Sequence, residues 1–249
     1  TTSGNSNADL VLSHASLLGD IVNAAGSNTT VVLQDQSVFK GITQNVSSVA
    51  VNSGAQWVLG GDSSVTAMSL DGGTVALGAE KQFYTLNLGS LQGSGTFALS
   101  ADFTQLKNSF LDISGRADGN FGLLINASGT DPIDGASLHV VHAGSGNAQF
   151  SLVGDTVDLG TWSYSLTQVR NDWYLDASTR TISPGTQSVL ALFNTAPTVW
   201  YGELSSLRSR MGELRLTDGQ AGGWVRTYGN KFNVSDASGM GYQQNQQGI

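Results

Sequence analysis

The residues of this chain that could do chemistry are few, and the histidines come first among them. There are three, His14, His139 and His142, and the last two lie three positions apart in an expected strand. Successive side chains of a strand point to opposite faces, so we expect His139 and His142 to face apart. That is poor geometry for a shared metal ion. The sequence predicts structural histidines here, with no metal and no other cofactor.

Two other short motifs could belong to enzymes. The run Gly60-Gly61-Asp62-Ser63-Ser64 is similar to a protease nucleophile motif, but no glycine follows to form a strained elbow, so a turn is favoured. Asp131 and Asp134 flank Pro132, where they could serve a glycosidase or occupy a solvated turn. A polysaccharide lyase would need a basic cluster, and the chain has only 11 lysines and arginines. We therefore expect that the chain is not an enzyme.

Composition sets the broad limits. The 249 residues carry a net charge of −8 and no basic stripe, which argues against nucleic-acid binding. The chain has no cysteine, which excludes a disulfide scaffold and a thiolate metal site. It has 32 glycines, and its 12% charged residues are about half the usual share. No run of about eighteen apolar residues occurs, so we expect no lipid-facing transmembrane helix.

Residues 1–80 contain weak internal repeats of short strands and Gly, Asn or Asp turns. Leu12, Ser16, Leu18 and Ile21 recur about 21 residues later as Leu33, Ser37, Phe39 and Ile42, then as Val51, Ala55 and Trp57, and a looser copy begins at Leu70. Strand-and-turn repeats of this length are typical of solenoids, and we predict a right-handed parallel β-helix with one rung per repeat. A β-sandwich, whose strands recur every 8–12 residues or so, is the alternative.

Residues 81–177 hold most of the large apolar side chains. The open end of a solenoid is an exposed sheet edge, so an aromatic-rich stretch at that end is a candidate cap. The side chains that we expect to pack in this cap are Tyr84, Phe97, Trp162, Tyr164, Trp173 and Tyr174. Three of them, Tyr84, Trp162 and Trp173, could instead stack on sugars, but packing is the favoured interpretation.

Helical spacing replaces strand alternation in residues 198–217, after a linker predicted at residues 178–197. Steps of four and three place one apolar stripe on a helix: Trp200, Leu204, Leu207, Met211 and Leu214. Charged side chains, among them Arg208, Arg210 and Arg215, decorate the other faces. Pro197 suits the start of such a helix. Residues 198–216 would span roughly 28 Å, close to a hydrocarbon core of about 30 Å, and a helix this polar could plug a barrel.

Residues 218–249 alternate as an outer-membrane strand does. Trp224, Arg226 and Tyr228 alternate with Val225 and Thr227. The segment could supply two strands at most, and two strands cannot close a barrel. We therefore expect the apolar face of the preceding helix to dock elsewhere or to be disordered.

Several motifs resemble segments of type Va autotransporters of the pertactin and diffuse-adherence adhesin type. LNLGSLQGSGTF at residues 86–97, LGTWSYSL at 159–166 and NDWYL at 171–175 resemble the pertactin-like autochaperone module. ELSSLRSRMGELR at 203–215 resembles the linker helix of that family, and GWVRTYG at 223–229 resembles the first strand of its translocator barrel. The resemblance covers about residues 83–249.

This resemblance implies an all-β architecture: a right-handed parallel β-helix, an aromatic-rich autochaperone cap, one α-helix and the first strands of an outer-membrane β-barrel. The implied function is secretion and surface display of a virulence-associated passenger. The cap would nucleate β-helix folding outside the outer membrane, and the helix would tether the passenger through the barrel. The alternative is an adhesin whose β-helix surface binds host cells or matrix directly.

The resemblance also implies partners and a location. Export would engage the outer-membrane assembly machinery, and a host-cell receptor or matrix would be the extracellular partner. The protein would lie at the cell surface or outer membrane of a Gram-negative bacterium, or its passenger would be released. Because the chain begins at Thr1 rather than at a methionine, we expect it to be a piece of a longer protein.

Overall fold

A computed structural model describes residues 1–2, 4–52, 54–130, 135–216, 225, 227–235 and 241–248. Within the helix, the side chains described are those of residues 184–193, 195, 197–202 and 204. The chain divides into two compact units, Thr1–Thr181 and Ile182–Ile249, which are described separately.

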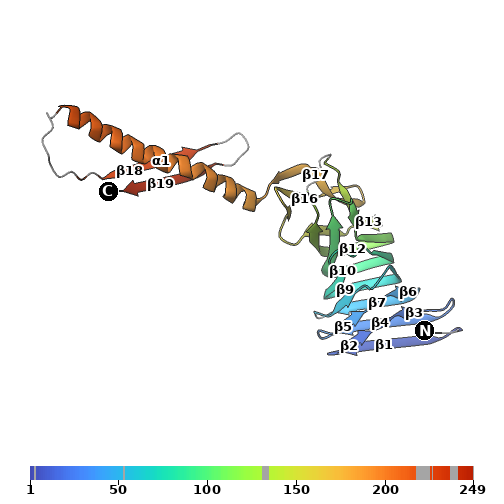
Figure 1. Ribbon diagram of the computed structural model, residues 1–249. Coiled ribbons are helices and arrows are strands. Elements are labelled where there is room, and N and C mark those ends of the chain that lie inside the picture. Colours follow the sequence, from blue (N-terminus) through green and yellow to red (C-terminus); the bar gives the residue numbers. More distant parts are fainter. Residues whose placement is uncertain are drawn as a thin grey trace. The chain divides into compact units, whose positions relative to one another are not determined.

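The first unit is a parallel β-solenoid, as the repeats predict (Figure 1). Its early turns consist of β1 (Asn7–Ser13), β2 (Ser16–Leu18), β3 (Ile21–Val22), β4 (Asn28–Gln34), β5 (Val38–Lys40), β6 (Thr43–Gln44), β7 (Val46–Asn52) and β8 (Gln56–Val58). Its later turns consist of β9 (Ser63–Ala76), β10 (Thr85–Asp102), β11 (Lys107–Asn108), β12 (Phe110–Ser128), β13 (Leu138–Gly146) and β14 (Gln149–Leu152). The pairing is parallel from β1 through β4, β7, β9, β10 and β12 to β13, which excludes the sandwich. The predicted right-handedness stays a prediction.

Each turn of the solenoid has three faces. In β9 the alternation of inward and outward side chains is broken twice by two adjacent exposed residues, Thr66-Ala67 and Asp71-Gly72. These breaks are corners, so residues 63–65 lie on a first face, 68–70 on a second and 74–76 on a third. Inward residues of successive turns stack in columns, such as Leu12, Leu33, Val51 and Leu70, all of which are buried. This stacking is what the repeats predict.

One predicted repeat alignment is wrong by one position. The sequence repeats align Leu18 with Phe39, but in the structure Leu17 pairs with Phe39. Leu18 is 84% exposed. Likewise, Ile21 pairs with Thr43 rather than Ile42. The cause is a turn one residue longer in the second repeat, where Asp35 and Gln36 adopt positive φ angles.

The parallel rungs continue well past residue 80. β10 pairs with β12 at an offset of about 25 residues, and β12 pairs with β13 and β14. The end of the parallel ladder therefore does not coincide with the cap boundary predicted at residue 81. Longer turns obscure the period of about 21 residues after β9, although the strands still stack.

Three antiparallel strands follow: β15 (Val157–Leu159), β16 (Trp162–Val169) and β17 (Asp172–Ile182). β15 pairs with β16, β16 neighbours β17, and β17 pairs antiparallel with β13. We call β15–β17 the terminal segment. The chain thus changes from parallel to antiparallel pairing at the last rung (Figure 1).

The second unit contains α1 (Pro184–Leu216) and the hairpin of β18 (Tyr228–Val234) and β19 (Tyr242–Gly248). The helix begins fourteen residues before the predicted start at residue 198, and Pro197 lies inside it. Ser183 explains the early start: its hydroxyl accepts a hydrogen bond from the Thr186 amide, and Pro184 occupies the first helical position. The sequence Ser183-Pro184, inside the predicted linker, is therefore a helix cap.

Candidate functional site

A column of aromatic rings joins the solenoid core to the terminal segment. Phe97 and Phe121 have ring centroids 5.8 Å apart, and Phe121 stacks on Phe150 at 5.3 Å. Phe150 then meets Trp173 of β17 edge-on at 4.7 Å. All four rings are buried. Because Phe150 lies in β14 and Trp173 lies in β17, the last contact of the column crosses from the parallel rungs to the antiparallel strands. Phe97 and Trp173 are among the predicted cap residues, whereas Phe121 and Phe150, in β12 and β14, are not.

The remaining predicted cap residues divide between two locations. Tyr164 is fully buried and contacts Phe103 at 4.5 Å between ring centroids, and Trp162 lies under the guanidinium of Arg180 at 4.7 Å. Both belong to the terminal segment. By contrast, Tyr84 packs against the core just before β10, and Phe97 lies within β10 itself. The positions of these side chains do not establish what they do. The role of the six predicted residues as a cap therefore stays a prediction.

His139 and His142 lie on the same face, which contradicts the prediction from strand alternation. Both imidazoles contact one oxygen of Asp172 on β17: His142 Nδ1 at 2.7 Å and His139 Nε2 at 3.0 Å. The register shifts between His139 and Val141, where two adjacent valines are both buried. This irregularity flips the alternation, as a β-bulge does.

The electrostatics of this cluster follow from the shared carboxylate. The hydrogen bond from His142 lowers the pKa of Asp172, the two imidazoles add a smaller coulombic contribution, and partial desolvation opposes it. Tyr174, a predicted cap residue, stacks on His139 with ring centroids 4.6 Å apart. The cluster therefore ties β13, a strand of the last parallel rung, to β17, which pairs antiparallel with it.

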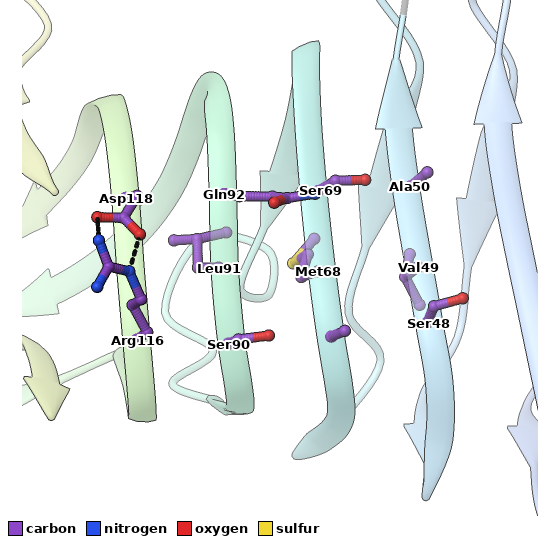
Figure 2. Close-up of a pocket in the computed structure, with 11 residues that line it drawn as sticks. Ser48, Val49, Ala50, Met68, Ser69, Ser90, Leu91, Gln92, Arg116 and Asp118 are labelled. Carbon is purple, nitrogen blue, oxygen red and sulfur yellow. Dashed lines mark hydrogen bonds and ion pairs between the residues drawn. The ribbon is translucent and has the colours of Figure 1, made fainter. Parts of the chain in front are cut away.

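Two grooves run across the outer surface of the solenoid on adjacent faces. The second-face groove has a volume of about 290 Å³ and is lined mainly by small residues of β7, β9 and β10, with Arg116 and Asp118 at one end (Figure 2). These two form an ion pair, which lowers the pKa of Asp118 chiefly through the hydrogen bond from Arg116. The first-face groove consists of two adjoining pockets of about 290 and 240 Å³ that share Asn45, Ser64 and Asn87.

The run of residues 60–64, which is similar to a protease nucleophile motif, holds its first serine in structural hydrogen bonds. Ser63 is buried, its hydroxyl donates to the Gly61 carbonyl, and it accepts a hydrogen bond from the Thr43 amide. The residues before it form the bend that leads into β9, as predicted. Within the described part of the chain, no group of three or more His, Asp or Glu side chains could hold a metal ion. Asp131 and Asp134 lie outside the described residues.

In the second unit, the helix contacts the hairpin through small and polar residues. The Thr198 hydroxyl donates to the Gln244 side chain at 2.6 Å, and Gly202 is buried close to Gln246. Trp200 is 68% exposed and Leu204 is 42% exposed, so these two side chains of the apolar stripe are not docked. Disorder, the other outcome expected for this face, stays a prediction. The side chains of Leu207, Arg208, Arg210, Met211, Leu214 and Arg215, and the residues Trp224 and Arg226, lie outside the description. Tyr228 begins β18.

None of the helices described is both long and apolar enough to cross a membrane.

Comparison with known proteins extends the resemblance beyond the motifs. The pertactin family profile matches residues 65–177, which include the later rungs and most of the terminal segment. The BrkA autotransporter of Bordetella pertussis is 35% identical over 222 residues, which cover 86% of this chain and 22% of BrkA. The adhesin/invasin autotransporter TibA of Escherichia coli is 39% identical over 166 residues, which cover 61% of this chain and 17% of TibA. The chain is a passenger segment of a type Va autotransporter of the pertactin type.

This autotransporter segment also has a structural neighbour. The crystal structure of the Hap adhesin of Haemophilus influenzae matches with a TM-score of 0.50 and 22% identity, covering 68% of this chain and 22% of Hap. At that identity the match supports the fold alone. An immunoglobulin A1 protease autotransporter of the same organism is 31% identical over 62% of this chain and 10% of its own length.

The autotransporter segment spans about a fifth or less of the relatives named. Its relatives place the protein at the outer membrane, the cell surface or in the medium of a Gram-negative bacterium. The relatives named here are autotransporters, and an adhesin and a protease are among them.

Proposed function

We propose that this segment serves the secretion and surface display of an autotransporter passenger. The terminal segment seals the solenoid and nucleates its folding outside the outer membrane. The observation that carries this proposal is the aromatic column that ends on Trp173. In this column the buried ring of Trp173 on β17 packs directly against Phe150 of the last parallel rung.

Local pairing supports a nucleating role. Two residues connect β15 to β16, and two connect β16 to β17. Hairpins of this kind form within microseconds, whereas parallel rungs join residues about 20–30 positions apart and close slowly. A terminal segment that folds first would present the edge of β17 to β13, and the remaining rungs could then add in sequence, as in other repeat proteins.

The second unit fits a tether. The helix of 33 residues is roughly 50 Å long, more than a hydrocarbon core of about 30 Å. We propose that it passes through the translocator barrel of the full-length protein, whose insertion depends on the outer-membrane assembly machinery. The exposed Trp200 and Leu204 would then contact the barrel wall.

The test compares two tryptophans of equal size in the full-length autotransporter. Trp173→Ala removes the last link of the column, and Trp57→Ala removes a fully buried ring from an early rung. We expect both proteins to reach the outer membrane. Trp173→Ala should abolish protease resistance of the whole passenger at the cell surface, and Trp57→Ala should expose only the early rungs.

The pattern of proteolytic fragments distinguishes a nucleating role of Trp173 from a contribution to stability alone. If the two variants lose the same fragments, Trp173 contributes stability without a special role in nucleation. If Trp173→Ala leaves passenger resistance unchanged, the proposal is wrong.

A second function, adhesion through the solenoid surface, is favoured by the first-face groove. We propose that the segment is not an enzyme and that the passenger contacts a host surface directly. Bacteria that display the full-length protein should adhere to host cells or matrix. Loss of residues 1–80, with the terminal segment retained, should reduce adhesion while display persists.

A further inference from the structure

A column of polar side chains crosses the first face in register. Ser64 pairs with Asn87, Asn87 with Asp112, and Asp112 with His142. His142 in turn pairs with Asp172 of the terminal segment. Residues paired in register point to the same side of a sheet, so these groups form one outward row. The row begins inside the first-face groove and continues past its end.

The groove offers two hydrogen-bond acceptors and one donor that the protein itself leaves unused. Among the described residues, the Asp112 carboxylate has no hydrogen-bond or ion-pair partner. Asn87 only donates, through a long contact of 3.5 Å to the Ser63 carbonyl, so its own oxygen is free. The Ser64 hydroxyl accepts from the Asn45 amide and keeps its proton for another acceptor. A ligand rich in hydroxyl groups would satisfy all three.

The charge of the lining narrows the ligand class. Asp62 and Asp112 are the ionised groups among the residues that line the two pockets, and no lysine or arginine lines them. An anionic ligand would be repelled and would find no cation to pair with. The second-face groove differs, because Arg116 lines it. A neutral polyhydroxylated ligand therefore fits the first face better than an anionic one.

An aromatic row lies beside the polar column. Phe110 precedes Asp112 by two positions on the same face of β12 and meets His139 at 4.8 Å between ring centroids. Tyr174 stacks on His139 with ring centroids 4.6 Å apart. Hydrophobic ring edges next to hydrogen-bonding groups suit a ligand with both apolar C–H patches and hydroxyl groups, which is the surface of a pyranose ring.

We propose that the first face binds a neutral oligosaccharide, with Ser64, Asn87 and Asp112 bonding successive units. Neighbouring strands are spaced about 4.8 Å apart, which is similar to the length of one pyranose unit, so a chain lying across the rungs meets one polar side chain per unit. This inference rests on the proposed adhesive function and specifies its ligand.

The test uses the purified 249-residue chain on an array of neutral, sialylated and sulfated oligosaccharides, followed by calorimetry with the strongest neutral ligand. Asp112→Ala and Asn87→Ala should each weaken binding at least about tenfold, as expected for lost hydrogen bonds in a binding site. The matched controls are Asp118→Ala on the same strand as Asp112 and Gln92→Ala on the same strand as Asn87, both on the second face. They should leave affinity within about twofold.

Each outcome bears on the proposal. Binding to neutral ligands with the expected difference between faces supports it. It is overturned by the absence of neutral binding, by binding to anionic ligands only, or by equal losses in the first-face and second-face variants. Denaturant unfolding of each variant checks that the solenoid is intact. Failure here would leave display and cap nucleation untouched, because those are measured by passenger protease resistance on cells.

Discussion

Trp173 meets Phe150 edge-on, with ring centroids 4.7 Å apart and ring planes inclined at 67°, across the boundary between parallel and antiparallel strands. Aromatic pairs in this geometry contribute about 0.5–1.5 kcal/mol beyond their buried area. The contact therefore couples the stability of the last rung to that of the terminal segment. It also makes the boundary accessible to a double-mutant experiment.

We predict that Trp173→Leu and Phe150→Leu are coupled. Each variant loses a buried ring and should lower the free energy of unfolding by roughly 1–3 kcal/mol, and the double variant should lose less than the sum by about 1 kcal/mol. Urea unfolding of the four proteins, followed by tryptophan fluorescence and circular dichroism, gives the coupling. Phe39→Leu with Phe150→Leu is the control pair from distant rungs and should be additive.

The sequence predicts the solenoid well because burial and turn chemistry are local. Inward residues such as Leu33 and Val51 alternate with outward ones, and glycine or asparagine follows several strands, such as Gly19 after β2 and Gly41 after β5. Strand alternation fails where a single backbone irregularity intervenes. The two buried valines between His139 and His142 are the only hint of the bulge, and from the sequence they suggest an ordinary buried strand.

The binding surface is harder to predict, because its residues meet only through register. Asn87 and Asp112 are 25 positions apart, Asp112 and His142 are 30 apart, and the turns between them differ in length. The local contexts Leu-Asn-Leu and Leu-Asp-Ile, each a polar residue between buried ones, are the signal that could have aligned the first pair. No comparable signal aligns Asp172, whose strand runs in the opposite direction.

The shared carboxylate predicts a pH dependence. Because the folded-state pKa of Asp172 is lowered, chiefly by the hydrogen bond from His142, its stabilising contribution is present above the unfolded pKa of about 3.9 and is lost as pH falls through the folded value. Asp172→Asn should therefore lower stability at pH 6, and its effect should shrink progressively as pH falls below about 3.9. Urea unfolding of both proteins across this range measures the difference. An effect that is the same at all pH values would contradict the assignment.

Where turns of the solenoid stack at one corner, we predict that position 119 requires glycine. Gly119 has a φ of 127°, and a Cβ there would lie 1.9 Å from the Gly93 carbonyl oxygen in the rung beneath. Gly119→Ala should cost roughly 3 kcal/mol or more, from backbone strain together with displaced strands. Gly72 also has a positive φ, 74°, but its Cβ would meet open space. Gly72→Ala should therefore cost only about 1–2 kcal/mol in the same unfolding experiment.

Two prolines in the helix allow a matched test of its early start. Pro197 lies in the helix interior, where it cannot donate a hydrogen bond to the carbonyl four residues earlier, and its side chain is exposed. Pro197→Ala should restore that bond and stabilise the helix by up to about 3 kcal/mol.

Pro184 supplies the control, because it is the first helical residue after the Ser183 cap. An amide at that position has no carbonyl partner within the helix, so Pro184→Ala should change stability by well under about 1 kcal/mol. Thermal melting at 222 nm reports the helix, since the other described elements are strands. Equal effects of the two substitutions would place the start of the helix near residue 198, where the apolar spacing alone had put it. A rise for Pro197→Ala alone would establish one continuous helix from Pro184.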